Sequence, residues 1–205
     1  MSKKTPKRPS LDLNLNTGFS SVTLHKSPAA QSPQKNLTGP PRVIRDIIAD
    51  LYNNIQRWNS LHIKGCSIVK EIASVKADTP KTYSTRLEEC ITSLYAVVEG
   101  LKINNDVFSK LVTQVYAFGR LPNIDDTVFF SLSASNIAER CVEVCEAYKK
   151  EFQAKQYILE NIAYTRTTND VMFLAAYWTH QLNITDKVNF VLKSLLVESG
   201  HRPVQ

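Results

Sequence analysis

Two cysteines lie at a spacing that could bind a metal ion. Cys141 and Cys145 are four residues apart, so on a helix they would share one face, and a site that borrows His62 or His180 is conceivable. The sequence has no C-x-x-C pair of the kind that zinc ribbons use. Both cysteines also fit an apolar pattern in which buried thiols behave as small hydrophobic side chains. We therefore expect structural thiols, no metal and no other cofactor.

Motifs for catalysis and nucleotide binding are absent from the sequence. A loop that binds phosphate through its backbone needs at least two glycines within a few residues, and the six glycines of this chain are widely separated. The four histidines form no H-E-x-x-H pattern, and no set of Ser, His and Asp, or of Cys and His, indicates a nucleophile. We therefore expect no catalytic residues, no enzymatic activity and no small-molecule substrate.

The first 40 residues differ in composition from the rest of the chain. They are rich in Ser, Pro, Lys, Asn and Thr, which predicts a disordered tail. Residues 1–42 hold seven of the 25 basic residues and one of the 19 acidic residues, a net charge of +6. From residue 43 onward 18 residues of each sign remain, so the net charge there is zero. The sequence predicts a disordered basic Ser/Pro-rich tail over 1–40 and a folded body over 41–205.

Three positions in the tail are candidates for phosphorylation. Thr5 and Ser32 match the pattern S/T-P-x-K/R that cyclin-dependent kinases select, and Ser27 matches its S-P core. Phosphate at these positions would cancel much of the basic charge. The run K-K-T-P-K-R could instead act as a nuclear import signal, or form a weak, salt-sensitive contact with nucleic acid.

The periodicity of the body predicts an all-α fold, a bundle of long antiparallel helices with coiled-coil character. Long helices are expected over about 42–76, 84–117 and 134–163, followed by a C-terminal two-helix unit over about 170–199. In each long helix, apolar residues recur at alternating steps of four and three, which is typical of coiled coils. Pro80 lies between the first helix and the second, because proline cannot continue a helix. The short connection predicts that these two helices are antiparallel neighbours. No stretch is long and apolar enough for a membrane helix.

Small or polar residues interrupt the apolar stripes of the first two helices. His62 and Gly65 interrupt the first stripe, and Asn105 interrupts the second. Such positions can specify the register of paired helices at some cost in stability. Lys155 occupies a position in the third stripe. The residues expected to be structural anchors are Trp58, Gly65, Leu101, Trp178 and Gly200.

The last residues of the chain suggest a docking surface. Gly200 is expected to end the last helix, because glycine commonly adopts the left-handed conformation there. His201 and Arg202 would then follow the last carbonyl groups, where cations interact favourably with the helix dipole. Arginine also suits paired hydrogen bonds to a partner's carboxylate. If the two short helices formed a hairpin, four polar residues would share one docking edge: His180, Gln181, His201 and Arg202.

Several motifs resemble one protein family. The first long helix contains W-x-x-L-x-x-x-G and I-A-x-V-K, the third contains E-x-Y-K-K-E, and the chain ends in W-x-H-Q and L-x-x-L-L-V-E-S-G-H-R. With T-P-K-R-P near the start, these resemble the cyclin-dependent kinase 2-interacting protein family over most of 42–202. The residues that carry the resemblance include Trp58, Leu61, Gly65, Ile72, Ala73, Val75, Lys76, Leu94, Ala96, Gly100, Leu101, Glu146, Tyr148, Lys149, Lys150, Glu151, Lys155, Trp178, His180, Gln181, Glu198, Gly200, His201 and Arg202.

The resemblance implies a non-enzymatic adaptor that acts in the cell cycle. Its expected location is the nucleus, with the cytoplasm as a second location. The implied partners are a cyclin-dependent kinase, proteins of DNA replication and of the DNA damage checkpoint, and an AAA+ ATPase complex with another helical subunit. In that complex the family is linked, as an accessory subunit, to maturation of the large ribosomal subunit. The alternative is a nucleic-acid-associated factor that binds through its basic tail. No membrane partner is expected.

Overall fold

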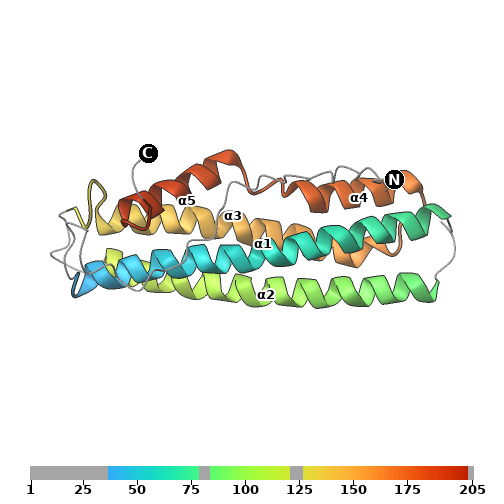
Figure 1. Ribbon diagram of the computed structural model, residues 1–205, viewed down its shortest axis with the longest axis horizontal. Helices are drawn as coiled ribbons and strands as arrows, with labels where there is room; N and C mark the ends of the chain where they lie inside the picture. Colours follow the sequence, from blue (N-terminus) through green and yellow to red (C-terminus); the bar gives the residue numbers. More distant parts are fainter. Residues whose placement is uncertain (1–36, 79–83, 121–126, 203–205) are drawn as a thin grey trace, which may run out of the picture.

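The computed structural model describes residues 37–78, 84–120 and 127–202, and it confirms the all-α fold class. Five helices follow one another along the chain (Figure 1): α1 (Pro40–Asp78), α2 (Thr85–Gly119), α3 (Ala134–Ile162), α4 (Thr168–His180) and α5 (Asp186–Glu198). In this described part the β structure is limited to one isolated bridge between Thr127 and Ser133. None of these helices has the length and apolar content needed to cross a membrane.

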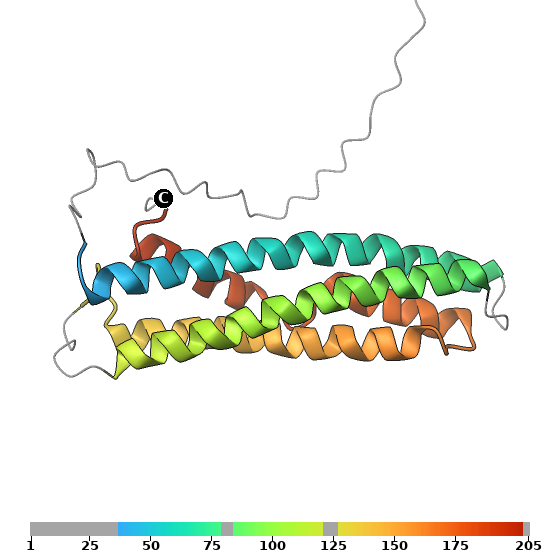
Figure 2. The same cartoon turned by 90° about the horizontal axis from the view of Figure 1, so that it is seen from below.

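The three long helices form the body of the molecule. Figures 1 and 2 show α1 beside α2 and α2 beside α3, with neighbouring helices running in opposite directions. Serine caps begin the second and third helices: the hydroxyl of Ser84 accepts from the Leu87 amide at 3.2 Å, and that of Ser133 from the Asn136 amide at 3.3 Å. Such caps satisfy amides that have no partner within the helix, so they help determine where it starts.

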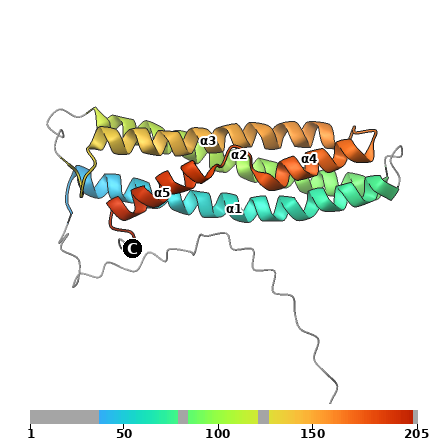
Figure 3. The same cartoon turned by 90° about the horizontal axis from the view of Figure 1, so that it is seen from above.

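The two short helices form a fourth layer over the face made by α1 and α3. Figure 3 shows α4 and α5 one after the other along this face. Among the described residues, both short helices contact α1 and α3 but not each other, so they do not form the hairpin on which the shared docking edge depends. Each short helix buries an apolar face, which includes Val171 and Leu174 in α4 and Val191 and Leu195 in α5. Lying end to end, both helices bury these faces against the bundle, which a hairpin standing away from it would not do.

The core follows the expected stripes, with differences of register in α2 and near the end of α3. All nine positions of the first stripe are buried: Ile44, Ile48, Leu51, Ile55, Trp58, His62, Gly65, Val69 and Ile72. In α2, however, Asn105 is only half-buried, and its neighbour Asn104 is the residue that enters the core. Asn54 Nδ2 donates to the Asn104 carbonyl at 2.9 Å, and Asn104 Nδ2 donates to the Asn54 carbonyl at 3.4 Å. A helix with 3.6 residues per turn drifts from a 3.5-residue repeat, so the buried position shifts along its length.

Candidate functional site

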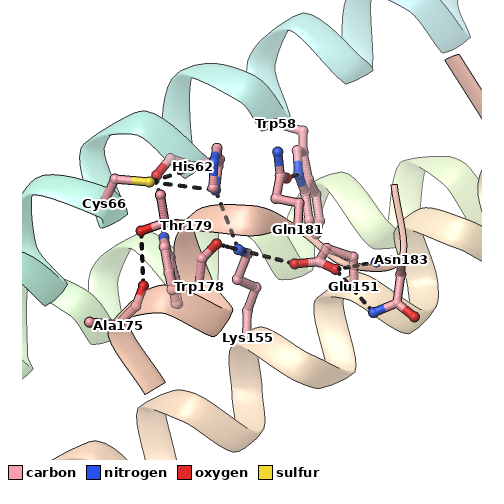
Figure 4. Close-up of polar contacts among 10 residues, drawn as sticks. All are labelled: Trp58, His62, Cys66, Glu151, Lys155, Ala175, Trp178, Thr179, Gln181 and Asn183. Carbon is pink, nitrogen blue, oxygen red and sulfur yellow. Dashed lines mark hydrogen bonds and ion pairs between the residues drawn. The ribbon is translucent and has the colours of Figure 1, made fainter. Parts of the chain in front are cut away.

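A cluster of polar side chains lies beneath the linker between α4 and α5 (Figure 4). We call it the polar cluster. At its centre are Glu151 and Lys155, one turn apart on α3, with Lys155 Nζ 3.1 Å from Glu151 Oε1 and both side chains fully buried. Burying charged groups is costly unless they are paired and their remaining hydrogen bonds are satisfied. The members of the polar cluster are His62, Glu151, Lys155, Trp178, Gln181 and Asn183.

Lys155 connects α3 to both α1 and α4. Besides the ion pair, its ammonium group donates to the Trp178 carbonyl at 2.5 Å and lies 3.3 Å from His62 Nδ1. It also lies 4.5 Å from the centroid of the Trp178 ring. An ammonium group has three donors, and these contacts supply three acceptors. Burial lowers the pKa of Lys155, and the charge of Glu151 opposes this shift.

The environment of His62 keeps its imidazole neutral. Burial and then the positive charge of Lys155 lower the pKa of His62 to about 3. The neutral ring accepts from Lys155 at Nδ1, while its Nε2 lies 3.5 Å from the sulfur of Cys66. Burial also raises the pKa of the Cys66 thiol. A reactive Cys–His pair needs the thiolate, so this arrangement disfavours nucleophilic chemistry at Cys66.

Two further bonds hold the linker to the long helices. The second oxygen of Glu151, Oε2, accepts from the backbone amide of Asn183 at 3.2 Å and from its side-chain amide at 3.0 Å. Trp58 Nε1 donates to Gln181 Oε1 at 2.9 Å. Gln181 ends α4 in the left-handed conformation, with φ of 45°, which turns the chain away from the helix axis. Glu151 and Trp58 therefore hold in place the turn between α4 and α5.

The two tryptophans of the chain lie inside the molecule, one in α1 and one in α4. Trp58 is fully buried, with its ring centroid 5.3 Å from that of Tyr148. Trp178 is also fully buried and donates from Nε1 to the His62 carbonyl at 3.3 Å. A Cβ added at Gly65 would lie 2.2 Å from Cζ2 of Trp178, so only glycine allows this approach of α4 to α1.

A second attachment of the fourth layer lies at the end of α5. Glu198 Oε1 accepts from three successive backbone amides, those of Phe130 at 3.0 Å, Ser131 at 2.5 Å and Leu132 at 2.8 Å. Burial alone would raise the pKa of Glu198, but the hydrogen bonds from Ser131, Leu132 and Phe130 outweigh it and lower the pKa. This carboxylate therefore holds the segment that precedes α3 against the end of α5.

The last described residues bind α1 of the same chain. Gly200 adopts a left-handed φ of 71°, which lets the His201 and Arg202 amides bond to a carbonyl in the last turn of α5. His201 Nε2 donates to the Arg45 carbonyl at 3.0 Å, and burial lowers the pKa of His201. The guanidinium group of Arg202 donates to the Tyr52 hydroxyl at 3.0 Å and lies 5.5 Å from the centroid of that ring.

The structure does not bring the four candidate docking residues together. Gln181 bonds to Trp58, whereas His201 and Arg202 bond to α1 beyond the far end of α5. His180 is exposed at the end of α4. The shared polar edge depended on a hairpin that does not form, so that part of the hypothesis is wrong. The phosphorylation candidates Thr5, Ser27 and Ser32 lie outside the described residues.

Sequence reasoning missed three polar residues that are central to these attachments. Glu151 and Glu198 lie in the motifs that carry the family resemblance, but neither was singled out as a site residue. Asn183 carried no signal beyond its place in a short connection. A lysine in an apolar stripe, Lys155, was the available hint, because a buried ammonium group requires a counter-charge.

The described residues contain no group of three His, Cys, Asp or Glu side chains close enough to hold a metal ion. Cys141 and Cys145 are both buried in the core, and their thiols form no disulfide. Burial raises the pKa of Cys141 to about 12 and also raises that of Cys145, which favours the protonated thiols. The two residues therefore pack as small apolar side chains.

The two short helices and their linker expose large apolar side chains. Met172 and Phe173 of α4 are 56% and 67% exposed, Leu182 of the linker is 65% exposed, and Phe190 of α5 is 69% exposed. We call these four residues the outer apolar surface. Exposed large apolar side chains that lie close together often mark a contact surface for another molecule.

The fold and these contacts define an all-helical protein whose buried ionisable groups hold its own helices together, and whose short helices expose apolar side chains. No family model matches the chain. Over most of its length, however, the chain is similar to cyclin-dependent kinase 2-interacting proteins. It is 23% identical to that of Xenopus laevis over 207 residues, which cover 87% of this chain and 99% of the relative.

Mammalian relatives give a similar result. The chain is 26% identical to the mouse protein and 23% identical to the human protein, each over 190 residues, which cover 78% of this chain and 90% of each relative. These similarities agree with the resemblance identified from the motifs, and they support a relationship to the cyclin-dependent kinase 2-interacting proteins.

Proposed function

We propose that this protein is a non-enzymatic adaptor that binds a cyclin-dependent kinase through the outer apolar surface of α4 and α5. The observation that carries the proposal is the exposure of Met172, Phe173, Leu182 and Phe190 on one layer of the fold. Methionine and aromatic residues are enriched at the centres of protein interfaces. The names of the relatives state that they interact with cyclin-dependent kinase 2.

The distribution of apolar residues on α4 supports a contact on its outer side. Val171, Leu174 and Trp178 bury one face against the bundle, while Met172 and Phe173 point to solvent. A helix that is apolar on both sides suits a position between two packed surfaces. Here one surface is the bundle of long helices and the other would be the partner. The polar cluster does not compete for this role, because its central groups are fully buried and bonded within the chain.

In its finer form the proposal follows the family. The adaptor acts in DNA replication and in checkpoint signalling, and as an accessory subunit of an AAA+ ATPase complex in maturation of the large ribosomal subunit. It resides in the nucleus, and its tail is a kinase substrate at Thr5, Ser27 and Ser32. Affinity purification from nuclear extract tests these roles, since an AAA+ ATPase or a kinase should dominate the bound proteins. Recovery of neither contradicts the finer proposal.

The direct test compares two matched double variants. Phe173→Ser/Phe190→Ser removes two aromatic rings from the outer apolar surface. Tyr95→Ser/Ile103→Ser removes two exposed apolar side chains from α2, which makes no contact with α4 or α5 in the described residues. Binding to a purified cyclin-dependent kinase 2–cyclin complex is measured by calorimetry. We expect the first variant to bind at least about ten-fold more weakly and the second to bind like wild type. Equal binding by both variants would contradict the proposed surface.

A second candidate function is binding of nucleic acid through the tail. The observation in its favour is that the whole net charge of +6 lies in residues 1–42. Such binding should weaken steeply with salt and should disappear when residues 1–38 are removed, with the helicity of the body unchanged. Retention of nucleic acid by the truncated chain would exclude the tail as the binding segment.

A further inference from the structure

Five of the eight buried polar residues of the described chain lie beneath its last segment or within it. We call residues 168–202 the strap. Glu151, Lys155 and Trp58 bond to the strap near its middle, and the carboxylate of Glu198, at its end, bonds to the segment before α3. By contrast, the buried polar residues that join α1 to α2 are one asparagine pair. The attachment of the strap thus differs in chemistry from the packing of the long helices.

Several of these polar groups obtain their partners only when the strap is closed. Oε2 of Glu151 is bonded to Asn183, and Lys155 is bonded to the Trp178 carbonyl, so both lose a partner when the strap leaves. Water would then hydrate the exposed charges and recover part of the free energy that burial removed. An apolar contact has no such compensation. The polar part of the contact therefore contributes less free energy than the same area of apolar packing would provide.

The connectivity and the helix lengths also favour a separate opening. The strap is joined to the rest of the described chain only through residues 163–167, after α3. Its two helices contain 13 residues each, whereas α1 contains 39. Isolated helices of about 12–15 residues are marginal in water, so an opened strap would lose helical structure. The long helices would keep their contacts with each other.

We propose that the strap is a conformational device that opens from α1 and α3 as one unit while the three long helices stay folded. Its two polar attachment points are the linker at 181–183 and residues 198–202. Opening uncovers the polar cluster and the face of α1 and α3 beneath it. The outer apolar surface belongs to the same unit, so a partner that prefers the closed conformation would hold the strap closed. This inference goes beyond the proposed function and does not require it.

Hydrogen exchange of the full-length protein, followed by mass spectrometry at neutral pH, tests the proposal without any substitution. Amides of α4 and α5 should share one opening free energy and exchange at least about ten-fold faster than those in the centres of α1 and α2. Equal protection of the strap and of the long helices would overturn the proposal, because all the helices would then open only by global unfolding.

A pair of matched variants tests the attachment at the linker. Asn183→Ala removes the side-chain donor to Glu151 and should raise the exchange rate of the strap at least about five-fold, without changing α2. Asn169→Ala changes an exposed residue of α4 and should leave the strap at the wild-type rate. An Asn183→Ala protein whose strap exchanges like wild type overturns the proposal. The proposal is also overturned if Asn183→Ala raises the exchange rate of the α2 amides as much as that of the strap amides.

Discussion

The contact between α1 and α2 is almost entirely apolar, whereas the contact between the strap and the long helices combines buried apolar faces with a group of buried polar side chains. Along α1 and α2, buried Ile, Leu and Val residues alternate over the whole length, with Asn54 and Asn104 as one polar pair. Beneath the strap lie a buried ion pair, a neutral histidine and Trp58, whose indole donates a hydrogen bond to Gln181. Apolar packing is strong but tolerates small shifts, whereas hydrogen bonds fail when their geometry is lost. The apolar packing of both contacts therefore provides most of the stability, and the polar groups beneath the strap determine where it sits.

The largest expected effect comes from removing the residue that belongs to both contacts. Trp58 packs against Tyr148 in the core and also bonds to Gln181 in the strap. Trp58→Ala should lower the free energy of unfolding by about 4 kcal/mol, since truncation of a buried tryptophan typically costs about 3–5 kcal/mol. Urea denaturation measures the change, with Tyr95→Ala, an exposed aromatic on α2, as the control expected within about 0.5 kcal/mol of wild type. A Trp58→Ala protein as stable as that control would show that the ring is not an anchor.

Breaking the buried ion pair should have the next largest effect. Lys155→Met leaves Glu151 buried without a counter-charge, so we expect a loss of about 3 kcal/mol in the free energy of unfolding. Adding Glu151→Leu to the same chain should recover part of that loss, because no buried charge then remains. The double-mutant cycle measures the coupling. Additive losses would mean that the two charges do not depend on each other. Glu146→Leu/Lys149→Met, which removes an exposed pair on the same helix, is the control.

The free energy of unfolding should depend on pH because His62 is neutral in the folded protein. Its pKa is about 3 in the folded protein and about 6.5 when unfolded, so the folded state binds fewer protons between these values. The stability from neutral His62 is intact above about pH 6.5 and is lost as the pH falls, by about 2 kcal/mol at about pH 5. His62→Gln should remove this slope, while His180→Gln, at an exposed position, should keep it. Denaturation experiments across this pH range measure the slope of stability against pH. The same slope for wild type, His62→Gln and His180→Gln would contradict the assignment of this pH dependence to His62.

Glu198 should contribute to the stability of the folded protein in a lower pH range than His62. Its pKa is lowered from the usual value of about 4.5, so its bonds to the amides before α3 are present above that pH and weaken as the pH falls further. The two contributions are therefore separated along the pH axis, because that of His62 begins to change at a higher pH.

The smallest expected effect comes from the end of the strap. His201→Ala/Arg202→Ala removes hydrogen bonds to the Arg45 carbonyl and the Tyr52 hydroxyl, and each is worth about 1 kcal/mol at a partly buried position. We expect a modest loss of thermal stability with faster exchange of α5, and no change in the affinity for the kinase complex. Unchanged stability together with lost binding would instead make this pair a docking site.

Much of the helical body could be predicted because its signals are local. Apolar residues at steps of four and three indicate a helix and its buried face, and Trp58 was recognised as an anchor from its position between Ile55 and Leu61. The same reasoning placed Lys155 in the third stripe. It could not supply the partners of that lysine, because Glu151 is one turn away on the same helix but His62 and Trp178 are distant in sequence.

Residue order by itself thus determined the all-helical class, the apolar faces of the long helices and the glycine that ends α5. These depend on backbone propensity and on periodicity within one segment, which any short window of sequence contains. Only the tertiary structure decided that α4 and α5 lie end to end, that Asn104 rather than Asn105 enters the core, and that Gln181, His201 and Arg202 bond to α1. Those outcomes depend on which surfaces meet in three dimensions, because a buried polar group takes the partner that packing brings within hydrogen-bond distance.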